Sequence, residues 1–407
     1  MSTNLRLLFR SLKFNAFLLF FLTVITPSLA QQVYYKTFGD GLRVMAKDSS
    51  FSLKMGFRFQ TRYAGVLNLE TDNWTDQMLV RRSRLKFDGF AFSPKFVYKV
   101  ELGLSNRDLS GGNNIQTGFT SRLILDAALK WNVHKSWFIW VGQTKLPGNR
   151  ERVISSQNLQ FVDRSLVNSR FNIDRDIGIQ VRHHNKVGEK GIIREIFSIS
   201  MGEGRNVITP NIGGYDYTFR LEYLPFGAFE NKGDYFSADL KREETPKLSI
   251  GATYDFNDGA AKQRGQLGLY MIDSLGNQFT NDLHTVFVDA IFKYQGFSIQ
   301  SEYANKSAKD NIIAASEFGN LRYATGTGFV LQAGYLLKNN LEPAVRYTRI
   351  RSDSEEFSSI REVNSYTFGL SKFIKDHNLK VQTDINYRDR LTGDDFLEYR
   401  LQVEMAF

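Results

Sequence analysis

The 407-residue sequence contains no cysteine. No disulfide can therefore hold the fold together, and a lipid-anchored cysteine at an export cleavage site is excluded. After the first 30 residues there is no apolar run of the roughly 18 residues that a membrane-spanning helix needs. Proline is scarce, with 7 residues, while 42% of the sequence is hydrophobic, and this combination argues against a disordered chain.

Recognised catalytic motifs are also missing. No GxSxG, HExxH or Walker-type glycine loop occurs, and the 5 histidines are scattered. His183 and His184 fall at an expected turn, and as neighbours on a strand they would point to opposite faces, so a shared metal is not expected. His284 opens an expected strand, as the histidine of a barrel hydrolase would, but no serine is marked out as its partner. The sequence thus predicts no catalytic residue, metal site, cofactor or nucleic-acid partner.

The first 30 residues have the pattern of an export signal. Basic residues precede an apolar run from Ala16 to Ile25, and small residues follow up to Ala30. This order is typical of a secretory signal peptide, which is removed from the exported chain. We therefore predict a signal peptide over residues 1–30 and a short periplasmic segment over residues 31–50.

From residue 51 onward, apolar and polar residues alternate with a period of two. In FSLKMGFRFQTRY, Phe51, Leu53 and Met55 share one face, while Lys54 and Arg58 lie on the other. A soluble β-sandwich also has one apolar face, but it needs one thick dry core and rarely continues as one domain for so many strands, whereas the charged opposite face here suits a wet lumen. Aromatic residues make up 14% of the chain, and tyrosines near strand ends suit the interface girdles of a membrane barrel.

These patterns predict an all-β fold, a transmembrane antiparallel β-barrel over residues 51–407 with about sixteen strands, each near the roughly ten residues that cross a bilayer at a tilt. The expected strands are residues 51–63, 79–91, 96–105, 123–133, 137–144, 177–183, 193–201, 215–224, 247–256, 284–294, 297–303, 328–337, 341–349, 364–373, 379–389 and 396–407.

The connections alternate between short and long, which is the outer-membrane pattern. The short ones are residues 295–296, 338–340 and 375–378, and the long ones are residues 145–176, 257–283 and 304–327. Residues 225–246 break the rule, because they should form a short periplasmic turn and do not. The connection over residues 145–176 is long enough to be functional, and we expect it to fold inward and narrow the pore.

Cations gather on the inner face of the first two expected strands. The two strands and the long connection contribute Lys54, Arg58, Arg62, Arg82, Arg84, Lys86, Lys145, Arg150, Arg152, Arg164 and Arg170. Arginine suits oxyanions because its planar fork makes two charge-assisted hydrogen bonds. Strict alternation turns Arg81 outward. The alternative interpretation is that these charges only keep the lumen wet, since acidic residues such as Glu101 and Asp126 share the inner face.

The residues from "YKTFGDGLRVMAKDSSFSLKMGFRFQ" through "VRRSRLKFDGF" and "FVYKVELGLS" resemble the phosphate-selective porins O and P of Gram-negative outer membranes. Looser likeness continues through "VGQTKLPGN", "PKLSIGATYDFN" and "FSIQSEY". The last segment, "FLEYRLQVEMAF", resembles the terminal strand of outer-membrane proteins, whose final aromatic is recognised by the barrel-assembly machinery. The resemblance implies a sixteen-stranded homotrimer with an arginine-lined constriction that selects anions, including phosphate or polyphosphate.

By this resemblance, Arg58, Arg81 and Arg82 fall at constriction positions, Arg152 lies near a constriction-loop lysine, and Asp126 faces the cations. Alternation turns Arg81 outward, whereas the resemblance places it in the constriction. A β-bulge beside Arg81, or a position near the end of the strand, would reconcile these two orientations. The chain departs from the family where an outer loop should carry a run of arginines, because "NDGAAKQRGQLG" offers only Lys262 and Arg264. The complete predicted set for the constriction is Arg58, Arg62, Arg81, Arg82, Arg84, Asp126, Lys145 and Arg152.

The sequence therefore predicts an outer-membrane porin that passes small anions by diffusion, with outer-membrane lipid around it. A weakly selective general porin is the alternative within this class. From other classes, a barrel hydrolase and a nutrient-docking barrel that serves a partner protein remain open.

Overall fold

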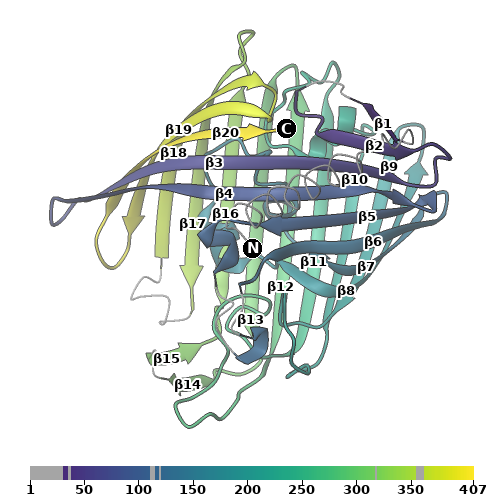
Figure 1. Cartoon of the computed structure of the whole chain (residues 1–407). Coiled ribbons are helices and arrows are strands. Elements are labelled where there is room, and N and C mark those ends of the chain that lie inside the picture. Colours follow the sequence, from purple (N-terminus) through teal and green to yellow (C-terminus); the bar gives the residue numbers. More distant parts are fainter. Residues whose placement is uncertain (1–30, 35–37, 111–114, 119–120, 317–318, 354–361) are drawn as a thin grey trace, which may run out of the picture.

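A computed structural model describes residues 31–34, 38–110, 115–118, 121–316, 319–353 and 362–407; the predicted signal peptide lies outside them. Sixteen antiparallel strands form a barrel that closes where β20 pairs with β3, from Ala406↔Arg58 to Phe396↔Asn68 (Figure 1). The barrel strands are β3 (Ser52–Asn68), β4 (Asn73–Ala91), β5 (Ser93–Gly103), β6 (Ile124–His134), β7 (Trp137–Lys145), β8 (Arg175–Val187), β9 (Gly191–Ser200), β10 (Asp216–Leu224), β11 (Lys247–Ala260), β12 (Asn281–Tyr294), β13 (Phe297–Ala308), β16 (Gly326–Tyr335), β17 (Leu341–Ser352), β18 (Glu362–Lys375), β19 (Leu379–Arg390) and β20 (Phe396–Ala406).

The period-2 pattern sets the two faces of each strand. Along β11, Ile250 and Tyr254 are exposed on the outside, while Ser249, Thr253 and Asp255 are buried inside. Apolar side chains thus face outward and polar ones inward, which is the arrangement of a barrel surrounded by lipid. The predicted barrel of about sixteen strands is confirmed.

The remaining elements are short. Strand β2 (Leu42–Ala46) continues the sheet beside β3 and pairs with β1 (Gln31–Tyr34), and β14 (Ile313–Ser316) forms a hairpin with β15 (Gly319–Arg322). The helical turns are α2 (Asn106–Leu109), η1 (Ile115–Thr117), α3 (Arg150–Val153), α4 (Leu166–Phe171) and η2 (Glu230–Tyr235). Within the described ranges, no helix is both long enough and apolar enough to cross a membrane.

Several strands run further than the pattern predicts. Strand β3 continues to Asn68 and β4 begins at Asn73, so their hairpin extends well beyond the expected ends at residues 63 and 79. The backbone ladder continues there through residues 64–68 and 73–78, in which apolar and polar residues do not alternate regularly. The expected loop over residues 304–327 likewise contains the β14–β15 hairpin.

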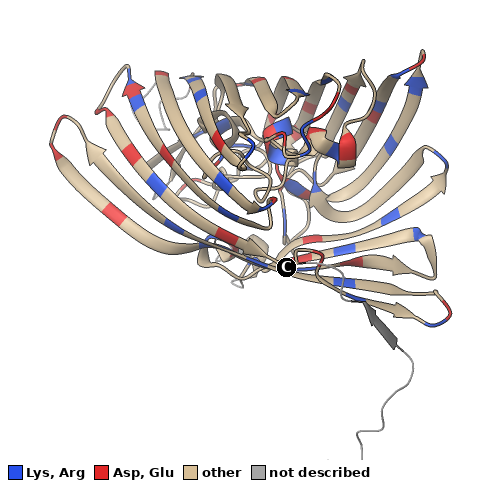
Figure 2. Ribbon diagram, turned by 90° about the horizontal axis from the view of Figure 1, so that it is seen from above, with Lys and Arg blue, Asp and Glu red and all other residues tan. Residues whose placement is uncertain are grey.

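The connection between β7 and β8 folds into the barrel, as predicted, and packs on the far wall (Figure 2). Val167 and Phe171 of α4 join a buried apolar cluster with Phe287 and Val330 of the wall. Gly328 makes room for this contact, because a Cβ atom there would lie 3.0 Å from the Phe171 ring. An apolar contact of this kind fixes the loop across the lumen, since burying such side chains is favourable by about 1.5–3 kcal/mol each.

Candidate functional site in the barrel lumen

The luminal loop, residues 146–174, is also held by buried polar contacts. Arg150 Nε donates to Asp289 Oδ1 at 2.6 Å and its Nη2 to Ser249 Oγ at 2.9 Å. Asn149 donates to Glu302 Oε1 at 2.9 Å. Arg150 is 1% exposed, so the prediction that it contributes to the basic lining of the pore is wrong. Its side chain holds the luminal loop against the barrel wall instead.

Three arginines of β3 and β4 converge on Asp163 at the opposite side of the loop. Arg62 Nη1 donates to Asp163 Oδ2 at 2.5 Å, and Arg81 donates to both carboxylate oxygens at 3.2 Å. Arg82 Nη2 donates to Oδ1 at 3.2 Å. Burial alone would raise the pKa of Asp163, but the arginines hold it well below its usual range. The carboxylate is therefore charged, and it balances part of the positive charge of the three arginines.

A β-bulge explains the orientation of Arg81. The β3–β4 register shifts from Gln60↔Arg82 to Thr61↔Val80, which leaves Arg81 as the extra residue. Strict alternation turns Arg81 outward, but a bulge re-aims the side chain. Arg81 therefore points toward Asp163 together with Arg82, and the bulge that would reconcile the two expectations is present.

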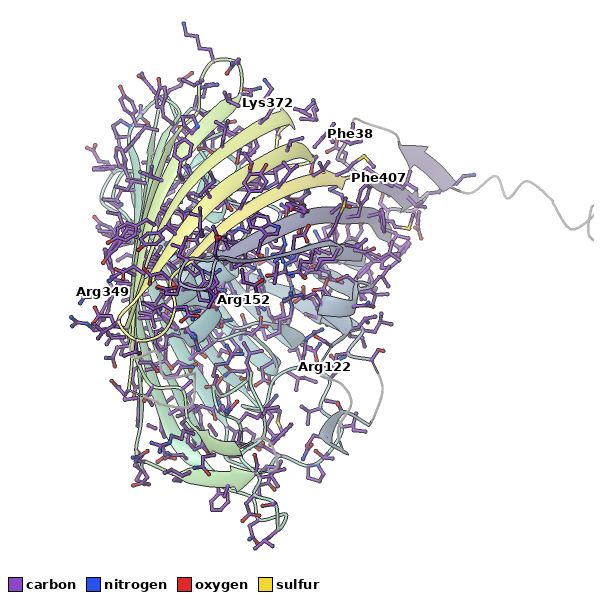
Figure 3. All side chains as sticks on the ribbon, turned by 90° about the vertical axis from the view of Figure 1, so that its left-hand side faces the viewer. Phe38, Arg122, Arg152, Arg349, Lys372 and Phe407 are labelled. Carbon is purple, nitrogen blue, oxygen red and sulfur yellow. The ribbon has the colours of Figure 1, made fainter. Side chains whose placement is uncertain are left out.

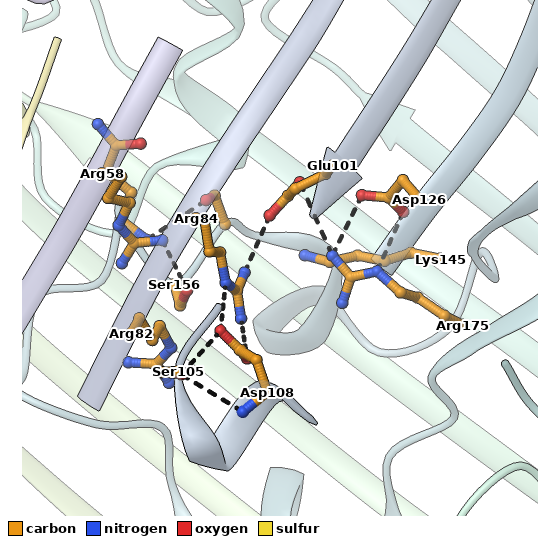
Figure 4. A network of polar contacts seen from close by, with 12 residues as sticks. Arg58, Arg82, Arg84, Glu101, Ser105, Asp108, Asp126, Lys145, Ser156 and Arg175 are labelled. Carbon is orange, nitrogen blue, oxygen red and sulfur yellow. Dashed lines mark hydrogen bonds and ion pairs between the residues drawn. The ribbon is translucent and has the colours of Figure 1, made fainter. Parts of the chain in front are cut away.

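The next cations on this wall are also paired (Figure 4). Arg58 binds Glu404 through Nε and donates to Ser156 Oγ at 3.0 Å. Arg84 donates to Asp108 at 2.7 and 2.9 Å and to Glu101 at 3.0 Å. The predicted basic wall exists, but much of its charge is balanced by carboxylates from β5, β20 and α2, whose spatial proximity the sequence does not indicate.

Asp126 is 0% exposed and lies in an ion-pair network. It accepts hydrogen bonds from Arg175 at 3.0 and 3.2 Å, from Lys99 at 2.6 Å and from Thr144 at 3.2 Å. It therefore holds cations of β5 and β8 in place rather than lining the open lumen. The predicted set does not include Arg175, because the strand that places it beside Asp126 is distant in sequence.

Lys145 and Arg164 bind the backbone of the luminal loop. Lys145 Nζ donates to the carbonyls of residues 152, 153 and 154 at 2.8–3.3 Å, and Arg164 donates to those of residues 151 and 154 at 2.7 Å. Arg152, by contrast, is paired with Asp174. Burial and the nearby Arg152 lower the pKa of Arg164 to about 9. Positive charge at Lys145 and Arg164 is thus not cancelled by a carboxylate within ion-pair distance in the described part of the chain.

Two of the cavities inside the barrel adjoin each other. The larger of the two has a volume of about 1110 Å³ and the smaller about 570 Å³, and both are lined by Arg84, Lys99, Glu101 and Ser155. The cavities meet at these four residues, which we call the neck. The lumen therefore has two compartments that are joined beside the β4–β5 wall.

The lining of the larger cavity is strongly basic. It contains sixteen lysines and arginines but only three carboxylates, Glu101, Asp108 and Asp174. Seven of these cations form ion pairs. The other nine have no carboxylate within 4.0 Å among the described residues: Arg107, Arg122, Lys130, Lys145, Arg164, Arg182, Arg205, Lys232 and Arg264.

Of the predicted constriction set, Arg81, Arg82, Arg84, Lys145 and Arg152 line the larger cavity. Arg84 and Arg58 line the smaller one, whereas Arg62 and Asp126 are absent from both linings.

Arginines do approach the lumen from the outer loops, although not in the way that the family resemblance suggests. Arg107, Arg122, Arg205 and Arg264 come from three different connections and line the larger cavity. Arg205 links two of these connections by donating to the carbonyls of Arg122 at 2.9 Å and Asp108 at 2.6 Å. These four arginines are therefore brought together from separate loops. A search for several arginines within one loop does not find them.

The irregular connection of residues 225–246 also enters the lumen, and we call it the luminal segment. Lys293 Nζ donates to the carbonyls of Gly233 at 2.8 Å and Ala238 at 2.6 Å. Arg242 donates to the carbonyl of Leu336 at 2.6 Å, and Asp234 pairs with Arg194. These contacts explain why this connection is long: it packs inside the barrel instead of joining two strands by a tight turn.

Replacing residues 228–244 by a short glycine–serine turn should widen the inner half of the pore. Because these residues help to line both cavities, we expect the single-channel conductance to roughly double. Removing the β14–β15 hairpin is the matched control, since neither cavity lining includes its residues. An unchanged conductance in planar bilayers would mean that the luminal segment does not limit ion flow.

The histidines contribute no shared centre. The sequence pattern predicts a turn at His183 and His184, and this prediction is wrong. Both residues lie within β8, because the strand continues to Val187. His183 contacts Glu195 at 2.6 Å, and His184 stacks against Phe138. No group of three potential metal ligands occurs among the described residues.

A lipid-facing antiparallel barrel with a polar lumen that is narrowed by an inward-folded loop is the architecture of a porin. The family comparison agrees with this class. The chain belongs to the phosphate-selective porin O and P family, whose sequence model matches residues 53–394. It is thus an outer-membrane channel of a Gram-negative bacterium.

Solved structures show the same fold at low sequence identity. OmpF of Salmonella typhi, in complex with daunomycin, has a TM-score of 0.54 and 14% identity, over 92% of this chain and 100% of that one. OmpT of Vibrio cholerae, in a trimer form, gives 0.53 and 10%, and an anion-selective porin of Comamonas acidovorans gives 0.52 and 11%; each match covers 88% of this chain and 100% of the other. None of the curated proteins compared with this chain matches it.

Proposed function

We propose that this porin conducts small anions, phosphate among them, by passive diffusion. The observation that carries the proposal is the group of nine lysines and arginines around the larger cavity that have no carboxylate within 4.0 Å among the described residues. A positive lumen raises the local concentration of anions and repels cations. Guanidinium groups add two-point hydrogen bonding to oxyanions, while the wet surroundings let the anion leave again.

The predicted site residues would then have different roles. Arg81, Arg82 and Arg84 face the passing anion together with Lys145 and Arg152. Further residues hold these groups in position: Arg58 fixes the loop through Ser156, Arg62 holds Asp163, and Asp126 orients Lys99 and Arg175.

A specific observation favours a weakly selective general porin as the second candidate. At the neck, Glu101 pairs with both Arg84 and Lys99, so the local excess of positive charge is small. Selectivity would then depend on the wider basic cavity and not on the neck. The two candidates differ in how strongly phosphate binds, and a current measurement separates them.

The test is the reversal potential of single channels in planar bilayers under a salt gradient, first with chloride and then with phosphate as the only anion. We expect anion preference, and we expect phosphate to block the chloride current. Anion preference without block would favour the general porin, and a cation-selective pore would refute the proposal.

Arg82→Ala should lower the anion preference and leave the barrel intact. Loss of one positive charge about 4 Å from a passing anion weakens attraction by about 1 kcal/mol in water, or roughly fivefold in local anion concentration. Arg349→Ala is the matched control, because Arg349 lies at the outer edge of the barrel (Figure 3) and pairs with Glu362. If both variants keep the wild-type reversal potential, Arg82 has no part in selectivity.

The proposed partners follow from the same architecture. We propose a homotrimer in outer-membrane lipid, with Phe407 presented to the barrel-assembly machinery at the end of β20 (Figure 3). The hydrolase alternative has little support, since His284 lies outside the lumen lining and contacts Tyr254 Oη at 2.8 Å.

A further inference from the structure

Four aromatic side chains point into the barrel from β7, β8 and the luminal segment. Phe138 and Trp140 occupy successive inward positions of β7, His184 comes from β8, and Tyr235 comes from the luminal segment. All four line the larger cavity. The lumen of such a barrel is normally polar, so a group of rings there is a departure that the passage of small inorganic anions does not require.

Two cations flank the indole of Trp140. The Nζ atom of Lys130 and the Cζ atom of Arg182 each lie 3.8 Å from the ring centroid. They approach from opposite sides, because β6 and β8 pair with the two edges of β7. These distances are typical of cation–π contacts.

Neither Lys130 nor Arg182 has a carboxylate within 4.0 Å among the described residues. The guanidinium of Arg182 donates to Gln180 Oε1, at 2.8 and 3.1 Å. The neighbouring Arg194 differs, since Glu222 and Asp234 neutralise it. Lys130 and Arg182 are therefore two basic side chains that contact one aromatic ring and that no described carboxylate pairs with.

Ring surface adjoins these cations. Phe138 is the register partner of Arg182 across β7 and β8, and His184 stacks on Phe138 with centroids 5.9 Å apart. A hydrated inorganic anion gains nothing from such surface, whereas a ring that leaves water for it is stabilised by burial and by contact with other rings.

We propose that Lys130 and Arg182, with Phe138 and Tyr235, form a subsite for monocarboxylates that carry an aromatic ring. The carboxylate would bind these basic side chains from the lumen side of the Trp140 indole, and the ring of the ligand would lie against Phe138 and Tyr235. The inference rests on the proposed anion channel and deepens it, because it names a class of organic anion. The competing explanation is that the rings only hold the two cations in position.

The test compares benzoate with acetate as blockers of the chloride current through single wild-type channels in planar bilayers. The two anions carry the same charge and differ in the ring. We expect half-block at a benzoate concentration about tenfold below that of acetate, since roughly 1.4 kcal/mol of extra binding corresponds to tenfold. Equal block by the two anions, in a channel that still prefers anions, would overturn the subsite and leave the proposed function standing.

Variants locate the effect. Phe138→Ala should remove most of the benzoate advantage and leave acetate block and the chloride reversal potential unchanged. Val141→Ala is the matched control, because Val141 faces outward on the same strand. Tyr235→Ala, on the luminal segment, tests the same site if the Phe138→Ala channel does not insert. Undiminished benzoate block in both Phe138→Ala and Tyr235→Ala channels would overturn the assignment.

Discussion

Replacing Arg84 and Lys99 together by glutamine should move the channel strongly toward cations. The change leaves Glu101 as the charged residue of the neck, so the local charge there falls by two units. At about 4 Å in water each unit is worth roughly 1 kcal/mol, and about 2 kcal/mol lowers anion occupancy of the neck some 30-fold. The reversal potential in a potassium chloride gradient should approach zero or change sign.

The control removes the same charge outside the lumen. Lys309→Gln with Lys372→Gln also deletes two lysine charges, but Lys309 is exposed beside Asp282 and Lys372 reaches the carbonyl of Asn339 on the outside. This pair should leave the reversal potential unchanged. If the neck variant keeps full anion preference, selectivity is decided in the larger basic cavity and the neck is a passive opening.

Asp163→Asn should have the opposite effect and tighten the binding of phosphate. The substitution removes the carboxylate that Arg62, Arg81 and Arg82 share, and it leaves three guanidinium groups without that ion-pair partner. A phosphate can accept the hydrogen bonds that the carboxylate gives up, and we expect half-block of the chloride current at a phosphate concentration at least about tenfold lower.

The luminal loop should stay in place in this variant. Arg346 Nη1 donates to the backbone carbonyl of Asp163 at 2.9 Å, and Asp384 accepts from the amide of Val162 at 3.1 Å; neither contact uses the lost carboxylate. Asp282→Asn deletes a carboxylate outside the lumen and is the control for net charge. Phosphate block that is weaker than in the wild type would show that Asp163 positions the arginines and does not compete with the anion.

The fold and the faces of most strands can be predicted from the sequence, since alternation is a local property. Leu85 and Phe87 indicate the outward face of β4 and thereby place Arg82, Arg84 and Lys86 inside. The family resemblance marks Arg58, Arg81 and Arg82, and the length of residues 145–176 predicts a loop within the barrel. Each of these inferences depends on neighbours in sequence or on a short motif.

The partners of the charged residues cannot be obtained in this way. Asp163 reaches three arginines about 80 to 100 positions away, and Glu404 reaches Arg58 across the closing pair of strands. Arg150 follows the same basic pattern as Arg152 but is buried against Asp289. The sequence does not reveal the group of arginines from the outer loops around the larger cavity, because they come from three connections and not from one.

The sequence by itself determined an exported, cysteine-free chain whose alternating residues form a barrel with an apolar outside and a charged inside. Only the tertiary structure decided which of those charges remain without a carboxylate, because neutralisation depends on distances of a few ångströms between strands and loops. The bulge at Arg81 shows the same division: the composition of the strand predicts its two faces, and a one-residue shift in pairing with β3 turns this arginine toward Asp163.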